Sequence, residues 1–242
     1  MRFPRLYAPI ILAHGLFGFD RIGLGPITLA TYFRHVPEAL RAAGNRVLVP
    51  RVHPTAGVAR RAGMLAEQIE AAFGAEPVHL IGHSMGGLDA RALLADPAWS
   101  GRALSLTTIG TPHLGSSLAD AARHRMGPAY RLLERLRLDH QALLDLRSEA
   151  ARAWHLATPP PERVACFSVA GDPPPDEVSW SLRPLHEALA RWEGPNDGLV
   201  SVASAQAFGT PLRTWPLDHL QQIGWSTPLP PRARVPRRHT PG

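Results

Sequence analysis

The chain contains no lysine, one cysteine and no apolar run long enough to cross a membrane as a helix. Because Cys166 stands alone, an internal disulfide is impossible, and its place in an apolar run predicts a small core residue. The 26 basic residues are all arginine, which indicates a coding bias, and against 20 acidic residues they give a formal net charge of +6. No nucleic-acid-binding motif accompanies this charge, so we expect no nucleic-acid partner.

The positive charge is concentrated at the C-terminal end and in one internal segment. The last eleven residues contain four arginines and no acid, and residues 227–242 are rich in proline and arginine. This composition predicts a disordered tail after a folded domain that spans residues 1–226. Five further arginines lie between residues 123 and 137, with a single acidic residue among them. They predict a solvated helix face or, alternatively, a face that favours anionic interfaces.

The folded part alternates between short apolar runs and helix-forming stretches. With 242 residues, 45% of them apolar, the chain can bury one substantial core. Residues 55–73 carry apolar side chains at spacings of three and four, which predicts a helix with one buried face. This alternation predicts an α/β fold whose mostly parallel sheet is covered by helices on both faces. The expected strands are residues 10–13, 47–49, 78–81, 104–109 and 164–169.

Residues 117–157 interrupt the alternation. Three helical stretches follow one another there, at residues 117–125, 129–138 and 141–155, with no strand between them. We expect a small helical cap over the carboxyl ends of the strands, where folds of this type bind ligands. The alternative is that these are ordinary peripheral helices.

A sharp turn at residues 82–87 joins the run 78–81 to a helix-forming stretch. The turn reads Gly-His-Ser-Met-Gly-Gly, so a strand, a Gly-x-Ser-x-Gly motif and a helix follow in the order that a nucleophile elbow requires. Its glycines leave room where strand and helix converge, and Ser84 is expected in a strained conformation with its hydroxyl exposed. Met85 opens the helix, so its N–H can donate to an oxyanion. The alternative is an ordinary glycine-rich turn.

A serine nucleophile needs a base, which in such folds comes late in the chain and after an acid. His219 follows the extended stretch 212–217 and precedes a helical stretch, so it lies on a strand-to-helix loop. His239 lies in the terminal tail, where nothing fixes it. We therefore predict His219 as the base.

The sequence leaves the acid open between two residues. Asp197 lies in an Asn-Asp-Gly sequence, which is also simple turn chemistry. Asp172 ends a strand-like run and is a rival, whereas Asp218 is adjacent to His219 and poorly placed to reach its Nδ1. Spacing alone favours Asp197 only slightly.

Five motifs in this order resemble the bacterial true lipases (triacylglycerol lipases) of the α/β-hydrolase fold. The resemblance covers most of the chain and implies Ser84 as nucleophile, His219 as base and Asp197 as the acid that orients it. It also implies the N–H groups of Leu16 and Met85 as the oxyanion hole. The motifs are residues 10–18, 82–87, 108–116, 196–201 and 218–220.

The resemblance implies a serine carboxylester hydrolase, a lipase or esterase, that acts through an acyl-enzyme on Ser84. Apolar residues flank the expected catalytic ones and would line an acyl pocket, which favours medium- to long-chain esters. Two alternatives remain: an acyltransferase that uses the same triad, and a catalytically inactive hydrolase fold that serves as a binding module. The expected pocket residues are Phe17, Leu199, Val200 and Leu220.

We expect no metal and no cofactor, although lipases of this family carry a structural calcium near the histidine loop. The family pattern places a carboxylate two residues after the histidine and a glutamine four residues later, where this chain has Gln221 and Trp225. Calcium prefers six to eight oxygen ligands, and Trp225 has no acceptor.

The expected partners are an acyl ester or lipid substrate and, transiently, a lipid interface, with no obligate protein partner. Members of the family are typically secreted. This chain shows no secretory signal, because the apolar run at 9–13 is short and is needed as a strand. We therefore expect a cytoplasmic protein, or a secreted one if a leader has been removed.

Overall fold

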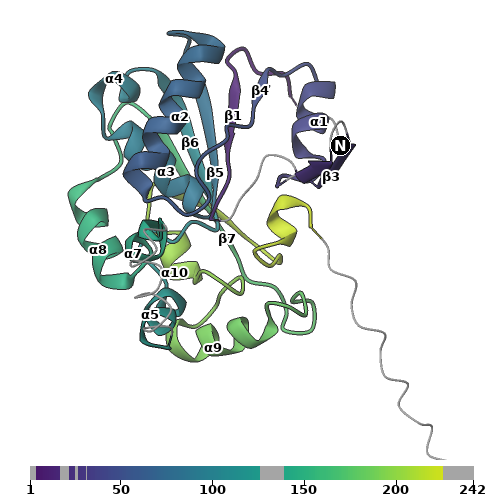
Figure 1. Cartoon of the computed structure of the whole chain (residues 1–242), viewed down its shortest axis with the longest axis vertical. Helices are drawn as coiled ribbons and strands as arrows, with labels where there is room; N and C mark the ends of the chain where they lie inside the picture. The colour runs from purple at the N-terminus through teal and green to yellow at the C-terminus, as the bar shows by residue number, and fades with distance from the viewer. Residues whose placement is uncertain (1–3, 17–21, 25–26, 31, 126–138, 226–242) are drawn as a thin grey trace, which may run out of the picture.

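A parallel sheet forms the centre of the molecule (Figure 1). The computed structural model describes residues 4–16, 22–24, 27–30, 32–125 and 139–225. Within this part, six strands form one sheet in the order β4-β1-β5-β6-β7-β8, and every neighbouring pair is parallel. The strands are β1 (Ile10–Ala13), β4 (Val47–Leu48), β5 (Val78–His83), β6 (Ala103–Ile109), β7 (Ala165–Gly171) and β8 (Thr210–Trp215). A separate antiparallel pair joins β2 (Ile22–Leu24) to β3 (Ile27–Ala30).

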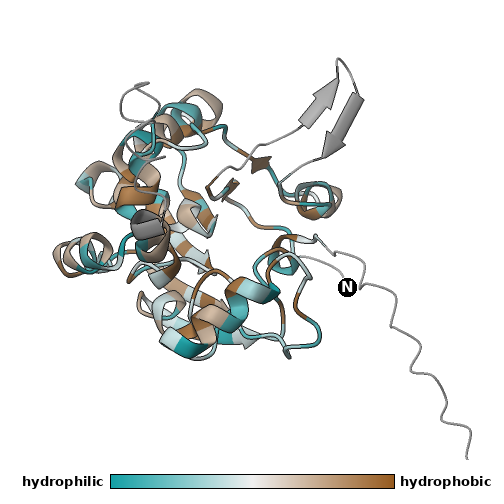
Figure 2. Ribbon diagram, turned by 60° about the horizontal axis from the view of Figure 1, so that its bottom comes forward, coloured by the Kyte–Doolittle hydropathy of each residue, from teal (hydrophilic) through white to brown (hydrophobic). Residues whose placement is uncertain are grey.

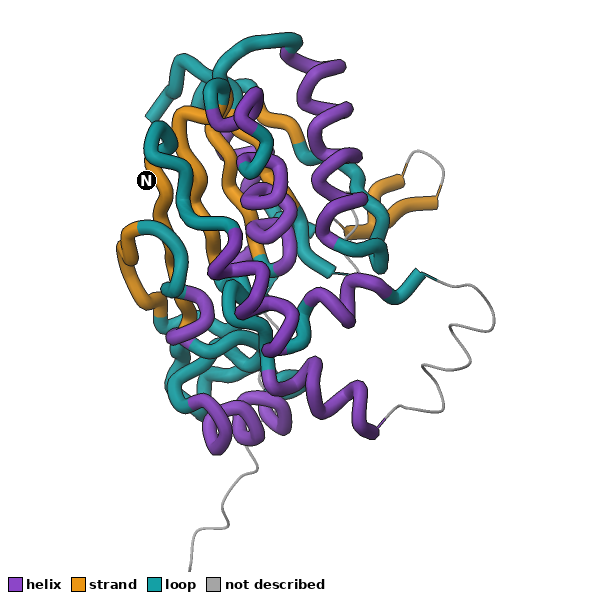
Figure 3. Tube along the Cα trace, turned by 90° about the vertical axis from the view of Figure 1, so that its left-hand side faces the viewer, coloured by secondary structure: helices purple, strands orange, loops and turns teal. Residues whose placement is uncertain are grey.

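Helices cover both faces of this sheet, which confirms the predicted α/β fold (Figures 1 and 3). Along β1, Ile11 and Ala13 pack with the cluster that includes α2, whereas Ile10 and Leu12 pack with Phe33 on the opposite face. Successive residues of one strand are therefore all apolar, as burial on both faces requires. The helices are α1 (Val36–Ala42), α2 (Val58–Phe73), α3 (Met85–Leu94), α4 (Pro97–Ser100), α5 (Ser117–Arg125), α7 (Gln141–Asp145), α8 (Ser148–Ala157), α9 (Arg183–Glu193), α10 (Val202–Ala205) and the short η1 (Gln221–Ile223).

Helix α2 begins three residues later than the predicted stretch 55–73. The N–H groups of Thr55 and Ala56 donate to the His53 ring in a preceding turn, and the N–H of Val58 donates to Asp145 Oδ2 at 2.7 Å. The helix therefore starts where a carboxylate of α7 accepts from its first amide. The predicted buried face is confirmed, because Val58, Ala62, Leu65 and Ile69 are all buried. Figure 2 shows the matching mixture of hydrophilic and hydrophobic residues along the helices.

The segment predicted as a single helix at 141–155 is two helices, α7 and α8, so that prediction was wrong. Arg147 is extended between them, with φ −68° and ψ 142°. The chain turns there because Ser148 donates through its hydroxyl to Asp120 Oδ2 of α5 at 2.6 Å. The predicted helix 129–138 and the tail 227–242 lie outside the described residues.

Figure 1 shows α5 and α9 at the lower end of the domain, with α7 and α8 above them on the left-hand side. Helix α5 packs against both α8 and α9. In the part of the chain that the structure describes, no helix is long and apolar enough to span a membrane.

Candidate active site

Ser84 stands between β5 and α3 in a backbone conformation that side chains rarely adopt. Its φ is 55° and its ψ is −132°, and His35 is the only other described non-glycine residue with a positive φ. This confirms the strained turn predicted from the sequence. The N–H of Ser84 donates to the carbonyl of Ile109 at the end of β6 at 2.9 Å, which ties the turn to the neighbouring strand.

The glycines of the turn are required by close packing. A methyl group on Gly82 would lie 2.5 Å from the Cα of Gly87, and one on Gly86 would overlap the carbonyl of Ala13. The turn thus closes on itself and presses against the end of β1. Only residues without a Cβ fit at these two positions.

Asp197 and His219 meet in the interior, although 22 residues separate them. His219 Nδ1 lies 2.8 Å from Asp197 Oδ2, and the two residues are 4% and 0% exposed. A carboxylate only accepts, so Nδ1–H of His219 donates, and Nε2 of the neutral ring is left as an acceptor. The second carboxylate oxygen accepts from the N–H groups of Leu199 and Val200, at 3.0 and 2.8 Å.

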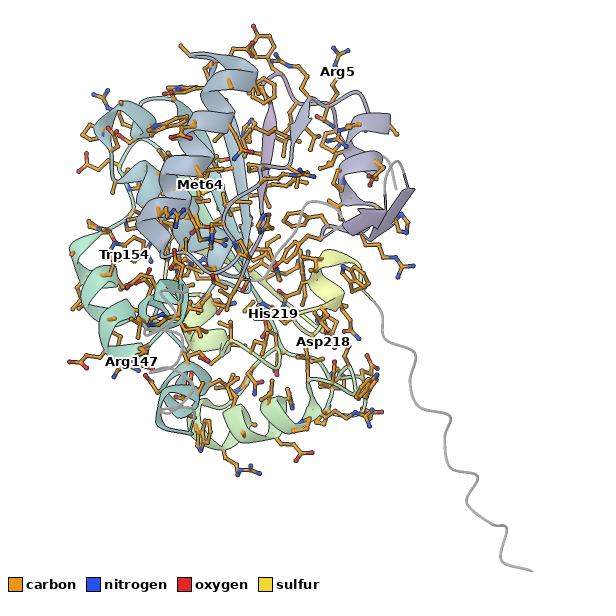
Figure 4. The ribbon with its side chains drawn as sticks, in the orientation of Figure 1. Arg5, Met64, Arg147, Trp154, Asp218 and His219 are labelled. Atoms are coloured by element: carbon orange, nitrogen blue, oxygen red, sulfur yellow. The ribbon has the colours of Figure 1, made fainter. Side chains whose placement is uncertain are left out.

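The two other aspartates considered from the sequence lie elsewhere. Asp172 is exposed, and its N–H donates to Trp215. The carboxylate of Asp218 is occupied by the backbone N–H groups of Ser179, Leu220 and Gln221. Figure 4 shows Asp218 and His219 side by side in the C-terminal segment. The structure therefore brings Asp197, and neither alternative, to His219.

His219 also lies beside the serine turn. Its ring packs against that of His83, the residue before Ser84, with ring centroids 4.5 Å apart. On the other side of the turn is Gly15, where a Cβ would lie 3.1 Å from Ser84 Oγ. Ser84 thus lies between the loop that follows β1 and the histidine loop.

Arg61 fixes the loop that follows β1. Its Nη2 donates to the carbonyls of His14 and Gly15, at 2.7 and 3.3 Å, and its Nε donates to Asp89 Oδ2 at 2.9 Å. A trans peptide directs its C=O and N–H to opposite sides, so holding the Gly15 carbonyl turns the N–H of Leu16 away from Arg61. Met85 is the first residue of α3, and its N–H is one that no intrahelical carbonyl satisfies.

The Arg61–Asp89 ion pair is completely buried. Burial raises the pKa of Asp89 to about 7, and the adjacent Arg61 opposes this rise. Sequence reasoning missed both residues. The signal was a charged side chain on the buried face of α2, between Val58 and Leu65.

Three of the four residues expected to form the acyl pocket lie in the described part of the chain. Val200 is 3% exposed and packs with Ala170 and Ala205, and Leu199 lies against the same cluster. Leu220 is half-buried, and Phe17 lies outside the described residues. A pocket of about 210 Å³ lies between α2, α3, α7 and α8, lined by Val58, Ala59, Leu88, Ala92, Asp145, Ala150, Ala151 and Trp154.

Arg91 anchors the end of α8 that carries Trp154. Trp154 is labelled in Figure 4. Its guanidinium lies over the rings of Trp154 and Phe208, 4.6 and 4.2 Å from their centroids, and donates to the carbonyl of Thr158 at 2.7 Å. Burial lowers the pKa of Arg91 to about 10, so the group remains charged near neutral pH. Arg91 is thus a buried cation that contacts two aromatic faces and the carbonyl of Thr158, the residue after α8, and it joins that helix firmly to α3.

The residues near the histidine loop do not fit a calcium ion. Gln221 Oε1 accepts from the N–H of Asp218 at 2.9 Å, and its Nε2 donates to the carbonyl of Glu177 at 3.0 Å. The indole of Trp225 donates to Tyr32. Among the described residues, no group of three or more His, Cys, Asp or Glu side chains is arranged to hold a metal. The amide of Gln221 joins the histidine loop directly to the segment that contains Glu177.

The fold and the serine turn define a class, the α/β-hydrolases. The model of the alpha/beta hydrolase fold family matches residues 58–171. A triacylglycerol lipase of Pseudomonas fragi is 32% identical over 266 residues, which cover 89% of this chain and 87% of that protein. The chain belongs to the triacylglycerol lipase family of this fold and is a lipase-like carboxylic ester hydrolase.

Two solved structures are similar over most of the chain. The mature lipase of Bacillus licheniformis superposes with a TM-score of 0.69 at 26% identity and covers 89% of this chain and 86% of its own. A metagenomic carboxyl esterase gives a TM-score of 0.73 at 25% identity, with 88% of this chain and 64% of its own covered.

We predict that chelation leaves the fold intact and that loss of the Gln221 amide weakens it. Excess EDTA is expected to leave the melting temperature unchanged. Gln221→Ala removes two hydrogen bonds that contribute about 1 kcal/mol each to the free energy of unfolding. Because 1 kcal/mol corresponds to roughly 2–4 °C for a domain of this size, the melting temperature should fall by about 4–8 °C. The measurement is thermal unfolding of the wild-type protein and of Gln221→Ala, with EDTA and with added calcium.

Gln206→Ala, which removes an exposed hydrogen bond to Thr214, is the matched control and is expected to change little. A drop of several degrees on chelation, restored by calcium, would contradict the prediction.

Proposed function

We propose that this chain hydrolyses carboxylic esters through an acyl-enzyme on Ser84, with His219 as the base and Asp197 as the acid. The observation that carries the proposal is the buried hydrogen bond between Asp197 and His219 beside the strained serine turn. A buried carboxylate that fixes Nδ1–H leaves Nε2 as the only nitrogen able to accept a proton. This is the arrangement that activates a serine hydroxyl.

In the proposed reaction, Nε2 of His219 takes the proton of Ser84 as Oγ bonds to the ester carbonyl carbon. The tetrahedral intermediate collapses when the alcohol oxygen leaves with that proton, and the acyl group stays on Ser84. A water molecule then gives its proton to Nε2 and attacks the acyl carbon. Collapse of the second intermediate returns the proton to Ser84 and releases the carboxylic acid.

The negative oxygen of each intermediate would accept from the N–H groups of Leu16 and Met85. A donor of this kind contributes roughly 3 kcal/mol to the transition state. Met85 adds the positive end of the α3 dipole. Arg61 supports the other donor, because it fixes the carbonyls of His14 and Gly15 before any substrate is bound. The donors are therefore oriented in advance, which is what such sites require.

We further propose that the acyl chain lies in the pocket between α2, α3 and α8 and that medium- to long-chain esters are preferred. One apolar cluster joins Leu16 and Met85 to Leu88 and Trp154. Leu88 lines the pocket one helical turn after Ser84, so the chain would leave the serine in this direction. Trp154, held by Arg91, would end the pocket.

The first prediction from this proposal concerns the triad. Ser84→Ala and His219→Ala are expected to reduce ester hydrolysis at least about 10³-fold, because triad members act as a unit. Asp197→Asn should be comparably severe, since the amide cannot accept at both oxygens. A serine-directed phosphonate should label the folded protein at Ser84, located by mass spectrometry, and should not label denatured protein.

Asp172→Asn is the matched control, because it makes the same change at an exposed aspartate. If Asp172→Asn inactivated the enzyme and Asp197→Asn did not, the assignment of the acid would be wrong. If the phosphonate failed to label Ser84, the proposed nucleophile would be wrong.

The second prediction concerns acyl-chain length. Across a series of p-nitrophenyl esters, each methylene buried in the pocket should lower the free energy of the transition state by about 0.8 kcal/mol. kcat/KM should therefore rise roughly fourfold per methylene until the pocket is full. Ala92→Phe fills the pocket next to Trp154 and should abolish this rise while leaving the butyrate ester nearly unchanged. The measurement is kcat/KM for each ester with both proteins.

Ala190→Phe makes the same change on an exposed position of α9 and should keep the wild-type profile. A wild-type maximum at the acetyl ester would contradict the preference. An unchanged profile in Ala92→Phe would place the acyl chain elsewhere.

A further inference from the structure

The proposed reaction gives no role to Gln222, whose side chain nevertheless lies against the acid. Its Nε2 is 2.9 Å from Asp197 Oδ2, the same oxygen that accepts from His219. The amide lies between the ends of β6 and β7, where a methyl group on Gly110 or on Gly171 would overlap it. Both strands thus end in residues that leave space for this one amide.

The hydrogen bonds of Gln222 can have only one direction. Because Asp197 accepts, Nε2 of Gln222 donates, and Oε1 therefore faces His83 Nε2 at 3.2 Å. His83 must carry its proton on Nε2, so its Nδ1 accepts from the hydroxyl of Tyr32 at 2.8 Å. The carboxylate alone determines the tautomer of a histidine on the far side of the amide.

The protonation of both rings agrees with this direction. Burial, and then the nearby His219 ring, lower the pKa of His83 well below its usual value, so the ring is neutral. Burial raises the pKa of Tyr32, against a hydrogen bond from the backbone of Gly15, so the phenol keeps its proton. The chain of donors therefore begins at the Gly15 N–H, which can only donate, and ends at a carboxylate, which can only accept.

We propose that Tyr32, His83 and Gln222 are positioning residues that couple the loop after β1 to the acid of the triad. The proposal rests on the function proposed above, in which Leu16 of that loop and Asp197 both act in catalysis. Through the three side chains, the loop that carries an oxyanion donor and the carboxylate that orients the base are held in one network. Hydrogen bonds in such a series strengthen one another in a buried setting.

Gln222 fixes the carboxylate in two ways. It occupies the second acceptor site of Oδ2, so that the carboxylate plane cannot rotate away from His219 Nδ1. It also shares the charge of Oδ2, which would otherwise attract the protonated His219 ring alone. Removing the amide should therefore lower kcat and stabilise the protonated ring, which moves the acid limb of the pH profile to higher pH.

The first experiment uses three variants in the full chain, one at Gln222 and two at His83. Gln222→Met keeps the length of the side chain without the amide, and His83→Phe keeps the ring against His219 without its nitrogens. Each should lower kcat about 10- to 100-fold with little change in KM, because Gln222→Met loses a hydrogen bond to the buried carboxylate and His83→Phe loses one to the amide that donates to it. Gln222→Met should also shift the acid limb upward.

His83→Gln restores a donor at the position of Nε2 and should recover most of the rate that His83→Phe loses. Melting temperatures identify variants that are merely less stable. A lower rate with a reduced melting temperature and an unshifted pH profile would mean a structural role only and would overturn the proposal. Unchanged kcat in Gln222→Met would overturn it as well.

The second experiment tests the coupling with a double-mutant cycle on kcat/KM. Tyr32→Phe removes the hydroxyl at one end, and Gln222→Met removes the amide at the other. If one network joins them, the double variant should lose little more than the worse single variant, whereas independent residues would give additive losses and overturn the coupling.

Ser84→Ala separates the two levels of the argument. If Ser84→Ala is inactive while the variants of Tyr32, His83 and Gln222 are fully active, the proposed function stands and the proposed network is wrong. If Ser84→Ala keeps its activity, the proposed function fails, and the proposed network fails with it.

Discussion

A carboxylate that is fully shielded from water must find its hydrogen-bond donors inside the protein, and Asp197 is such a group. Its two oxygens accept from two backbone amides of its own turn, from His219 and from Gln222. These donors come from separate segments, so the ends of β6 and β7, the aspartate turn and the histidine loop must converge at one point. The arrangement of the site follows from supplying one buried charge with partners.

The same constraint explains the two buried arginines. Arg61 is paired with Asp89 and uses its remaining donors on the carbonyls of His14 and Gly15, in the loop after β1, and on the carbonyl of His53. Arg91 has no carboxylate partner among the described residues and is held by two aromatic faces, by imidazole nitrogens and by the end of α8. One arginine therefore orients backbone beside Ser84, and the other holds α8. The guanidinium groups of both arginines form their hydrogen bonds with neighbouring segments.

The fold and the serine turn were predictable because their signals are local. Apolar runs, the spacing along α2 and the glycines around Ser84 each act within a few residues, and the strands and the strained turn appear where they indicate. Spacing favoured Asp197 over Asp172 only slightly, because the choice depends on which loop reaches His219 across the sheet. The division of residues 141–155 into two helices was missed for a related reason, since it is set by Asp120 on another helix. A sequence pattern within one segment does not indicate which contacts another segment will make with it.

The two consecutive glutamines of η1 show why the remaining residues escaped sequence reasoning. Gln221 turns toward Asp218 and Glu177 and joins two loops, whereas Gln222 turns toward Asp197 and His83. Nothing in a Gln-Gln pair distinguishes these roles, because an amide can donate and accept in either direction. The direction is imposed by the partner that has no choice: the backbone N–H of Asp218 for one, the carboxylate of Asp197 for the other. Gln222 therefore gains its role only when strands end in Gly110 and Gly171, more than fifty residues upstream, and leave the space it occupies.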